Sequence, residues 1–376
     1  MRSTYARRMG VSVLVAGVAL STVAACGSSK KSDNGNGSST PTGAAATGAG
    51  GSAQATFTSA VAKVTSGDSA TVTLRLGATE AQLKAFASET GQNGKLPSDT
   101  ALALLTGGSI TFATHAEAGD LKTAATTGKT DYDFAINAGG GPILEFRYLS
   151  GSKRAFIKLD VPKIATLSGK TVPPAIAQYG KTPQFSFLQD ALAGKWLELQ
   201  GLPAIIQQFS TLAGGASAPA SPAAGASGDV ASKLLSTLTA DVAATDAGST
   251  DKGEHLVLAA PLQKLAADLQ SITASVPGGS LAGSRLTKLN DVPNRTVNVD
   301  AYVKDGALTT LSLDIVQFAP ADKASTVAGQ HLPIELDFAS TAGDTGAPSG
   351  ATPVDLSKLA AQFGPLLAGQ LGSAGG

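Results

Sequence analysis

The chain has 376 residues, with 28 Lys and Arg against 28 Asp and Glu. Such a length accommodates two or three average domains, or one large β-rich domain with targeting and linker segments. Charged residues make up 15% of the chain, whereas typical soluble domains have roughly 25%. This composition excludes long charged coiled coils and argues against a basic nucleic-acid groove. A single cysteine excludes an intramolecular disulfide and cysteine-rich zinc sites.

The N-terminus carries a targeting pattern. Three arginines lie among the first eight residues, and residues 10–23 are apolar. A stretch of about 14 residues is too short to span a bilayer core of ~30 Å as a helix, but it suits a signal peptide. The stretch ends in Val23-Ala24-Ala25-Cys26, and an aliphatic residue and two small residues before a cysteine resemble the lipobox of bacterial lipoproteins.

This resemblance implies that residues 1–25 are removed and that Cys26 becomes an acylated N-terminus. Two or three acyl chains, palmitate among them, would then hold the protein at the extracytoplasmic face of the cell membrane, since each buried CH₂ contributes about 0.8 kcal/mol. The alternative is a free cysteine beside an ordinary signal-peptidase site. Ordinary secretion is the expected route, because the residues around Arg7-Arg8 fit the twin-arginine motif poorly.

Low-complexity runs predict the domain organisation. Residues 26–54 are mostly Gly, Ser, Ala and Thr without apolar periodicity, so we expect a disordered tether that reaches roughly 30 Å. A second run, 214–228, is either a domain linker or a surface insertion. The folded unit is therefore expected at 55–360, with the end of a helix and a flexible tail at 361–376.

Between these runs the pattern alternates with period 2. In Asp131-Tyr132-Asp133-Phe134 every second residue is apolar, which is typical of a half-buried strand. Asp305-Gly306 predicts a type I′ hairpin turn between two such strands. About ten strands are expected, nearly all antiparallel because their connections are short, at 69–76, 108–115, 131–137, 143–149, 154–159, 195–199, 254–259, 296–304, 307–318 and 332–338.

Helical spacing of apolar residues is found in shorter segments. Leu262, Leu265 and Leu269 illustrate it, since they recur at i, i+3 and i+7. Helices grouped between meandering strands predict an α+β fold with helices on one side of a curved antiparallel sheet. The helices are expected at 55–66, 80–89, 100–105, 203–212, 229–238, 261–272 and 355–367.

No motif supports catalysis or a metal site. The three histidines lie far apart in the sequence, and no G-x-S-x-G motif occurs. Gly139-Gly140-Gly141 precedes a strand, not a helix, so it predicts a turn and not a phosphate loop. Asp131 and Asp133 share a strand face, where paired carboxylates are common without catalysis. We therefore expect a non-enzymatic protein without cofactor or metal.

Several short motifs occur in an order that resembles the actinobacterial lipoproteins of the LppX/LprG type, which share the LolA-like half-barrel. After the lipobox and tether, an opening helix runs through residues 60–64 into the first strand. Later come a hairpin with Ser150-Gly151, a Gly-Lys-Trp-Leu sequence at 194–197, and the strand 299–303 before an Asp-Gly turn. The chain is longer than this pattern in regions 79–105 and 160–228.

The resemblance implies a long curved antiparallel sheet, a half-barrel with helices packed on its concave side, that binds or carries an acylated lipid or glycolipid. Four phenylalanines are the expected lining of an apolar cavity: Phe112, Phe134, Phe146 and Phe156. The expected partners are the membrane, through Cys26, and the lipid, with no nucleic acid. The alternative is an envelope adaptor or sensor that binds a protein or the cell wall through its outer surface.

Overall fold

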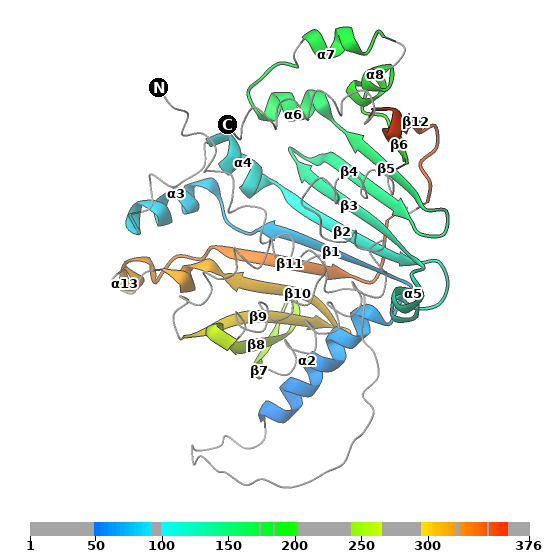
Figure 1. Ribbon diagram of the computed structural model, residues 1–376. Helices are drawn as coiled ribbons and strands as arrows, with labels where there is room; N and C mark the ends of the chain where they lie inside the picture. Colours follow the sequence, from blue (N-terminus) through cyan, green and yellow to red (C-terminus); the bar gives the residue numbers. More distant parts are fainter. Residues whose placement is uncertain are drawn as a thin grey trace, which may run out of the picture.

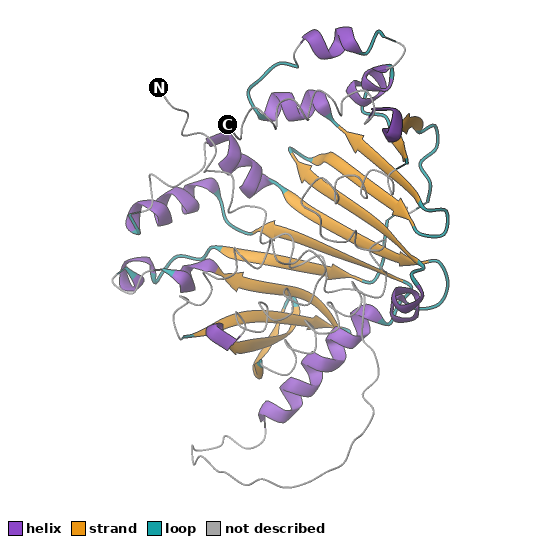
Figure 2. Ribbon diagram, in the orientation of Figure 1, coloured by secondary structure: helices purple, strands orange, loops and turns teal. Residues whose placement is uncertain are grey.

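The computed structural model describes residues 49–91, 99–172, 174–182, 185–201, 242–264, 295–319, 323–343 and 346–359. Figures 1 and 2 show one broad sheet with helices at its margins and one long helix beneath it. Its strands are β1 (Ser69–Leu76), β2 (Ser109–Ala116), β3 (Thr130–Ala138), β4 (Gly141–Leu149), β5 (Arg154–Leu159), β6 (Leu197–Gln200), β7 (Ala243–Thr250), β8 (Gly253–Pro261), β9 (Thr296–Lys304), β10 (Ala307–Asp314), β11 (Pro333–Ala339) and β12 (Thr352–Asp355).

The helices are mostly short. They are α2 (Ala49–Thr65), α3 (Glu80–Glu89), α4 (Asp99–Gly107), α5 (Leu121–Thr127), α6 (Val161–Leu167), α7 (Pro174–Tyr179), α8 (Phe187–Leu192), the 3-10 helix η5 (Ile315–Phe318) and α13 (Ala324–Val327). The expected opening helix therefore begins at Ala49, inside the range expected to be tether. None of the described helices is long and apolar enough to cross a membrane.

The sheet has 12 strands in the order β12-β6-β5-β4-β3-β2-β1-β11-β10-β9-β8-β7. All pairs are antiparallel except β12 with β6. The sheet is open, since its edge strands β12 and β7 lie at opposite ends of this order. β6 and β7 flank the 214–228 run in the sequence, so strands on both sides of that run belong to one sheet.

The hairpin between β9 and β10 confirms the turn that the sequence predicts. Asp305 and Gly306 both have positive φ, 53° and 71°, as the type I′ turn requires. Lys63 of α2 donates a hydrogen bond to the Asp305 carbonyl, which ties the opening helix to this end of the sheet.

Helix α2 packs against β7, β9, β10 and β1 and forms the larger apolar core. Its buried residues recur every three or four positions, which places them along one side of the helix: Ala53, Phe57, Ala60, Val61 and Val64. The same apolar cluster includes buried residues of β8 and β9 such as Leu256 and Ala301, both 0% exposed. Burying a Val, Leu or Phe side chain contributes roughly 1.5–3 kcal/mol, so this layer supplies much of the fold's stability.

Other predictions are confirmed in part or lie outside the described residues. The strand expected at 307–318 ends at Asp314 and continues as η5. The helix expected from Asp355 follows a short strand, β12, that ends at that residue. The helices expected at 203–212 and 229–238, the 214–228 run, the signal peptide and Cys26 all lie outside the described residues.

Candidate functional site

A row of aromatic side chains crosses the centre of the sheet. Phe112 of β2 pairs with Phe134 of β3, and Phe134 pairs with Phe146 of β4. Directly paired residues of neighbouring strands point to the same face, so these three rings share one face. Val72 and Ile157 extend the row on either side. The structure therefore brings together three of the four phenylalanines that the sequence singles out.

Phe156 lies on the opposite face. It pairs with Arg147, whereas its neighbour Ile157 pairs with Phe146. Its side chain is 0% exposed, and the Arg154 guanidinium stacks 4.9 Å from the ring centroid. Phe156 thus cannot line the same surface as the other three phenylalanines, because one residue of register separates the two faces of a strand.

The aromatic row belongs to a broader apolar face, which we call the aromatic face. Period-2 alternation in β2–β5 gives it these further members: Ile110, Tyr132, Ile136, Leu144, Tyr148 and Leu159. The three phenylalanines and Tyr132 are half-buried. Burial raises the pKa of the Tyr132 hydroxyl above its usual value, as expected beside apolar neighbours such as Phe112, whose ring centroid is 5.9 Å away.

In the described part of the chain, the aromatic row falls between two buried clusters. The larger cluster, under α2, includes Val72 of β1. The smaller one joins α8, β6 and β12, with Ile157 packed against it. Neither cluster includes Phe112, Phe134 or Phe146. The middle of the sheet thus presents an apolar, half-buried surface between two packed ends.

The other face of the same strands is polar. Arg147 pairs with Asp133 at 2.9 Å, and Lys158 with Glu145 at 2.8 Å. Trp196 lies under both cations, with its ring centroid 5.2 Å from the Arg147 guanidinium and 5.8 Å from the Lys158 Nζ. In the sequence Asp133 forms a carboxylate pair with Asp131. In the structure its carboxylate is instead the ion-pair partner of Arg147. We call this surface the ionic face.

The chain between β11 and β12 runs along the ionic face. Thr71 donates a hydrogen bond to the Thr341 carbonyl at 2.6 Å, and Arg147 donates one to the Gly346 carbonyl at 2.5 Å. Figure 1 shows this connection passing from the middle of the sheet to its β12 edge. The two faces therefore differ in kind: one is apolar and the other is covered by ion pairs and this crossing segment.

Glu198 on β6 is expected to give the fold part of its dependence on pH. Arg154 binds its carboxylate through two hydrogen bonds, at 2.9 and 2.7 Å, and this contact lowers the pKa of Glu198 from its usual 4.5. Because the folded-state pKa is the lower one, the stabilisation is complete above about pH 4.5 and is lost as the pH falls. Urea unfolding should show that Glu198→Gln is less stable than the wild type at neutral pH and that this difference shrinks in acid.

Glu254→Gln is the control, since this side chain has no ion pair within the described ranges. The assignment is wrong if both variants follow the same pH profile relative to the wild type.

One cavity of about 400 Å³ lies where β4 and β5 meet α6 and α8. Its walls combine apolar side chains with charged ones: Pro142, Ile143, Leu144, Pro162 and Leu192 with Glu145, Lys158, Asp160 and Lys163. None of the four phenylalanines contributes to it. Leu144 is the one member of the aromatic face that does, so the cavity adjoins this face at one end.

No metal-binding cluster appears in the described ranges. No three His, Cys, Asp or Glu side chains there lie close enough together to hold a metal ion. His255 contacts Asp300 at 2.8 Å and stacks on Tyr302, while His331 contacts Asp314 at 3.0 Å. Asp131 accepts a hydrogen bond from the Ser150 backbone at 2.7 Å, which is a turn contact.

Comparison with solved structures finds a weak likeness. The chain is similar to the crystal structure of lipoprotein LppX from Mycobacterium tuberculosis, with 10% sequence identity, 79% of this chain and 99% of that chain covered, and a TM-score of 0.29. No family profile matches the chain, and no curated protein does. A likeness at this level assigns no function to the chain.

Proposed function

We propose that this protein is a lipid-anchored extracytoplasmic lipoprotein that binds or carries an acylated lipid or glycolipid on the aromatic face. One observation carries the proposal: Phe112, Phe134 and Phe146 stand in register on a half-buried apolar face. Large contiguous apolar patches on soluble proteins commonly mark lipid, membrane or protein contacts. The proposed activity is non-catalytic.

An acyl chain suits this face by its chemistry. The rings and the aliphatic side chains around them offer no hydrogen-bond donor or acceptor except the hydroxyls of Tyr132 and Tyr148. An acyl chain likewise needs none, and covering it contributes about 25 cal/mol per Å² of apolar surface removed from water. Because the membrane interior offers a similar environment, transfer between membrane and protein needs only a small difference in free energy.

The location belongs to the same proposal and is supported by the lipobox-like sequence at Cys26. An acylated Cys26 would hold the protein beside the membrane from which such a lipid comes. The residues before Ala49, where α2 begins, would form the flexible link between the anchor and the sheet.

The test is mass spectrometry of lipids that remain bound when the protein is isolated from its own membranes. We expect a stoichiometric acylated lipid in the wild type and its loss in Phe134→Asn, because the amide adds polarity to the apolar face. Ala135→Asn is the matched control, since it adds the same group to the same strand on the opposite face. It should retain the lipid.

A folded wild-type protein that carries no lipid and binds none added would refute lipid binding and direct attention to a protein or cell-wall partner. Equal lipid loss in both variants would show that the aromatic face is not the site.

A further inference from the structure

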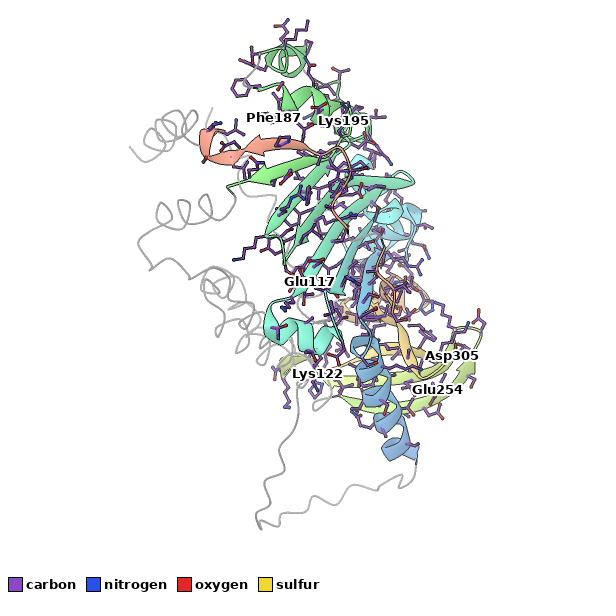
Figure 3. All side chains as sticks on the ribbon, turned by 90° about the vertical axis from the view of Figure 1, so that its right-hand side faces the viewer. Glu117, Lys122, Phe187, Lys195, Glu254 and Asp305 are labelled. Atoms are coloured by element: carbon purple, nitrogen blue, oxygen red, sulfur yellow. The ribbon has the colours of Figure 1, made fainter. Side chains whose placement is uncertain are left out.

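The short helices beyond β5 form a second unusual surface. Figures 1 and 2 show α6, α7 and α8 standing together past the β5–β6 end of the sheet, and both α6 and α7 contact α8. In Figure 3 the labelled Phe187 and Lys195 mark this end, far from Lys122 on α5. We use the name α6–α7 surface for the part of it formed by Ile164, Lys170, Tyr179 and Lys181.

Two large apolar side chains are exposed on it. Ile164 of α6 is 37% exposed and Tyr179 of α7 is 60% exposed. Tyr179 is nevertheless held in place, because its ring packs edge-on against Phe185 at 6.4 Å, and Phe185 packs against Phe187 at 6.5 Å. The fold therefore presents a tyrosine to the outside on an aromatic support.

All charged residues in the segment that contains α6 and α7 are basic. Between Asp160 and Asp190 the sequence contains Lys163, Lys170 and Lys181 and no acidic residue. Lys170 and Lys181 are exposed, and neither ammonium group has an ion pair with any residue that the structure describes. This contrasts with the sheet, where Arg147, Arg154 and Lys158 are all paired.

We propose that the α6–α7 surface docks on an anionic lipid surface. Unpaired lysines within six residues of the exposed Ile164 and Tyr179 in the sequence match the two components of such a surface, the negative headgroups and the acyl boundary beneath them. Tyrosine favours this boundary because its ring is apolar and its hydroxyl is polar. Each lysine near an anionic membrane strengthens binding about fivefold. This docking is independent of what the aromatic face carries.

The experiment measures whether Tyr179 meets lipid. The full chain, purified from membranes, is reconstituted into vesicles of phosphatidylglycerol and brominated phosphatidylcholine in equal parts, and into vesicles without phosphatidylglycerol. Tyr179→Trp adds a second tryptophan to Trp196, and subtraction of the wild-type signal isolates the new one. Ser152→Trp is the control, at the exposed turn that begins β5, opposite the end where α6 follows it.

We expect bromine to quench the tryptophan at 179 in phosphatidylglycerol vesicles and to leave the one at 152 unquenched. Lys170→Gln with Lys181→Gln should weaken docking about 25-fold, fivefold for each lysine. The matched pair Lys129→Gln with Lys304→Gln, at the other end of the strands, should leave it within about twofold of the wild type, because it removes the same charge away from the surface.

Equal quenching at 179 and 152, no quenching at 179, or quenching that does not depend on phosphatidylglycerol would each overturn the proposal. A change in emission at 179 that follows protein concentration without vesicles would assign the surface to a second copy of the chain instead. Lipid bound to the aromatic face is measured separately by mass spectrometry. The quenching results therefore neither support nor refute lipid binding by that face.

Discussion

Replacing Phe156 with alanine should destabilise the fold by about 3–5 kcal/mol, the usual cost of deleting a fully buried phenylalanine side chain. The ring is 0% exposed and lies on the ionic face beneath the Arg154 guanidinium, which pairs with Glu198. Its loss would leave a cavity that this ion pair cannot fill. Urea unfolding of the isolated protein measures the change.

Phe134→Ala is the informative comparison. This ring is half-buried on the aromatic face, so its removal should cost about half as much, because less surface is returned to water. The two variants should also differ in bound lipid, which Phe156→Ala retains and Phe134→Ala loses. Similar unfolding free energies for the two variants, or lipid loss in Phe156→Ala alone, would contradict the assignment of the faces.

Arg147→Met should also destabilise the protein by about 3–5 kcal/mol, as expected when one partner of a buried ion pair is removed. The Arg147 side chain is 8% exposed and that of Asp133 is 19% exposed. The same guanidinium binds the Gly346 carbonyl, so the substitution would also remove this hydrogen bond to the chain between β11 and β12.

Two further variants separate these effects. Asp133→Asn with Arg147→Met should be more stable than Arg147→Met alone, because no half-buried carboxylate is left without its cation. Lys195→Met removes an exposed pair with Asp190, in which the lysine is 59% exposed, and should cost at most about 1 kcal/mol. If Arg147→Met is no more harmful than Lys195→Met, the buried pair is not a major stabilising contact.

The sheet could be predicted from the sequence wherever one face is apolar and the other polar. Asp131-Tyr132-Asp133-Phe134 alternates cleanly, and β3 lies there with its tyrosine and phenylalanine on one face. At β5 the apolar character of Phe156 is misleading, because the charged Arg154 and Lys158 lie two positions to either side of it and strict alternation places all three on one face. The pairing of Ile157 with Phe146 agrees with that placement.

The remaining elements lack such a signal. β7 consists of small and polar residues and is almost fully exposed at the sheet edge. Its sequence therefore lacks the alternation of apolar residues that would predict a strand. β12 has four residues and pairs with β6 in parallel, which depends on a chain that crosses the ionic face. Tyr132 belongs to the aromatic face with the three phenylalanines, and its alternation with Asp131 and Asp133 could have placed it there.

The central claim is that an acyl chain lies against the aromatic face, and photo-crosslinking tests it most directly. The full chain is incubated with a phospholipid that carries a diazirine in its acyl chain, irradiated, and mapped residue by residue. We predict adducts at Phe112, Phe134, Phe146 or their neighbours on that face. Adducts confined to residues of the ionic face such as Phe156, or to residues outside β1–β5, would contradict the claim.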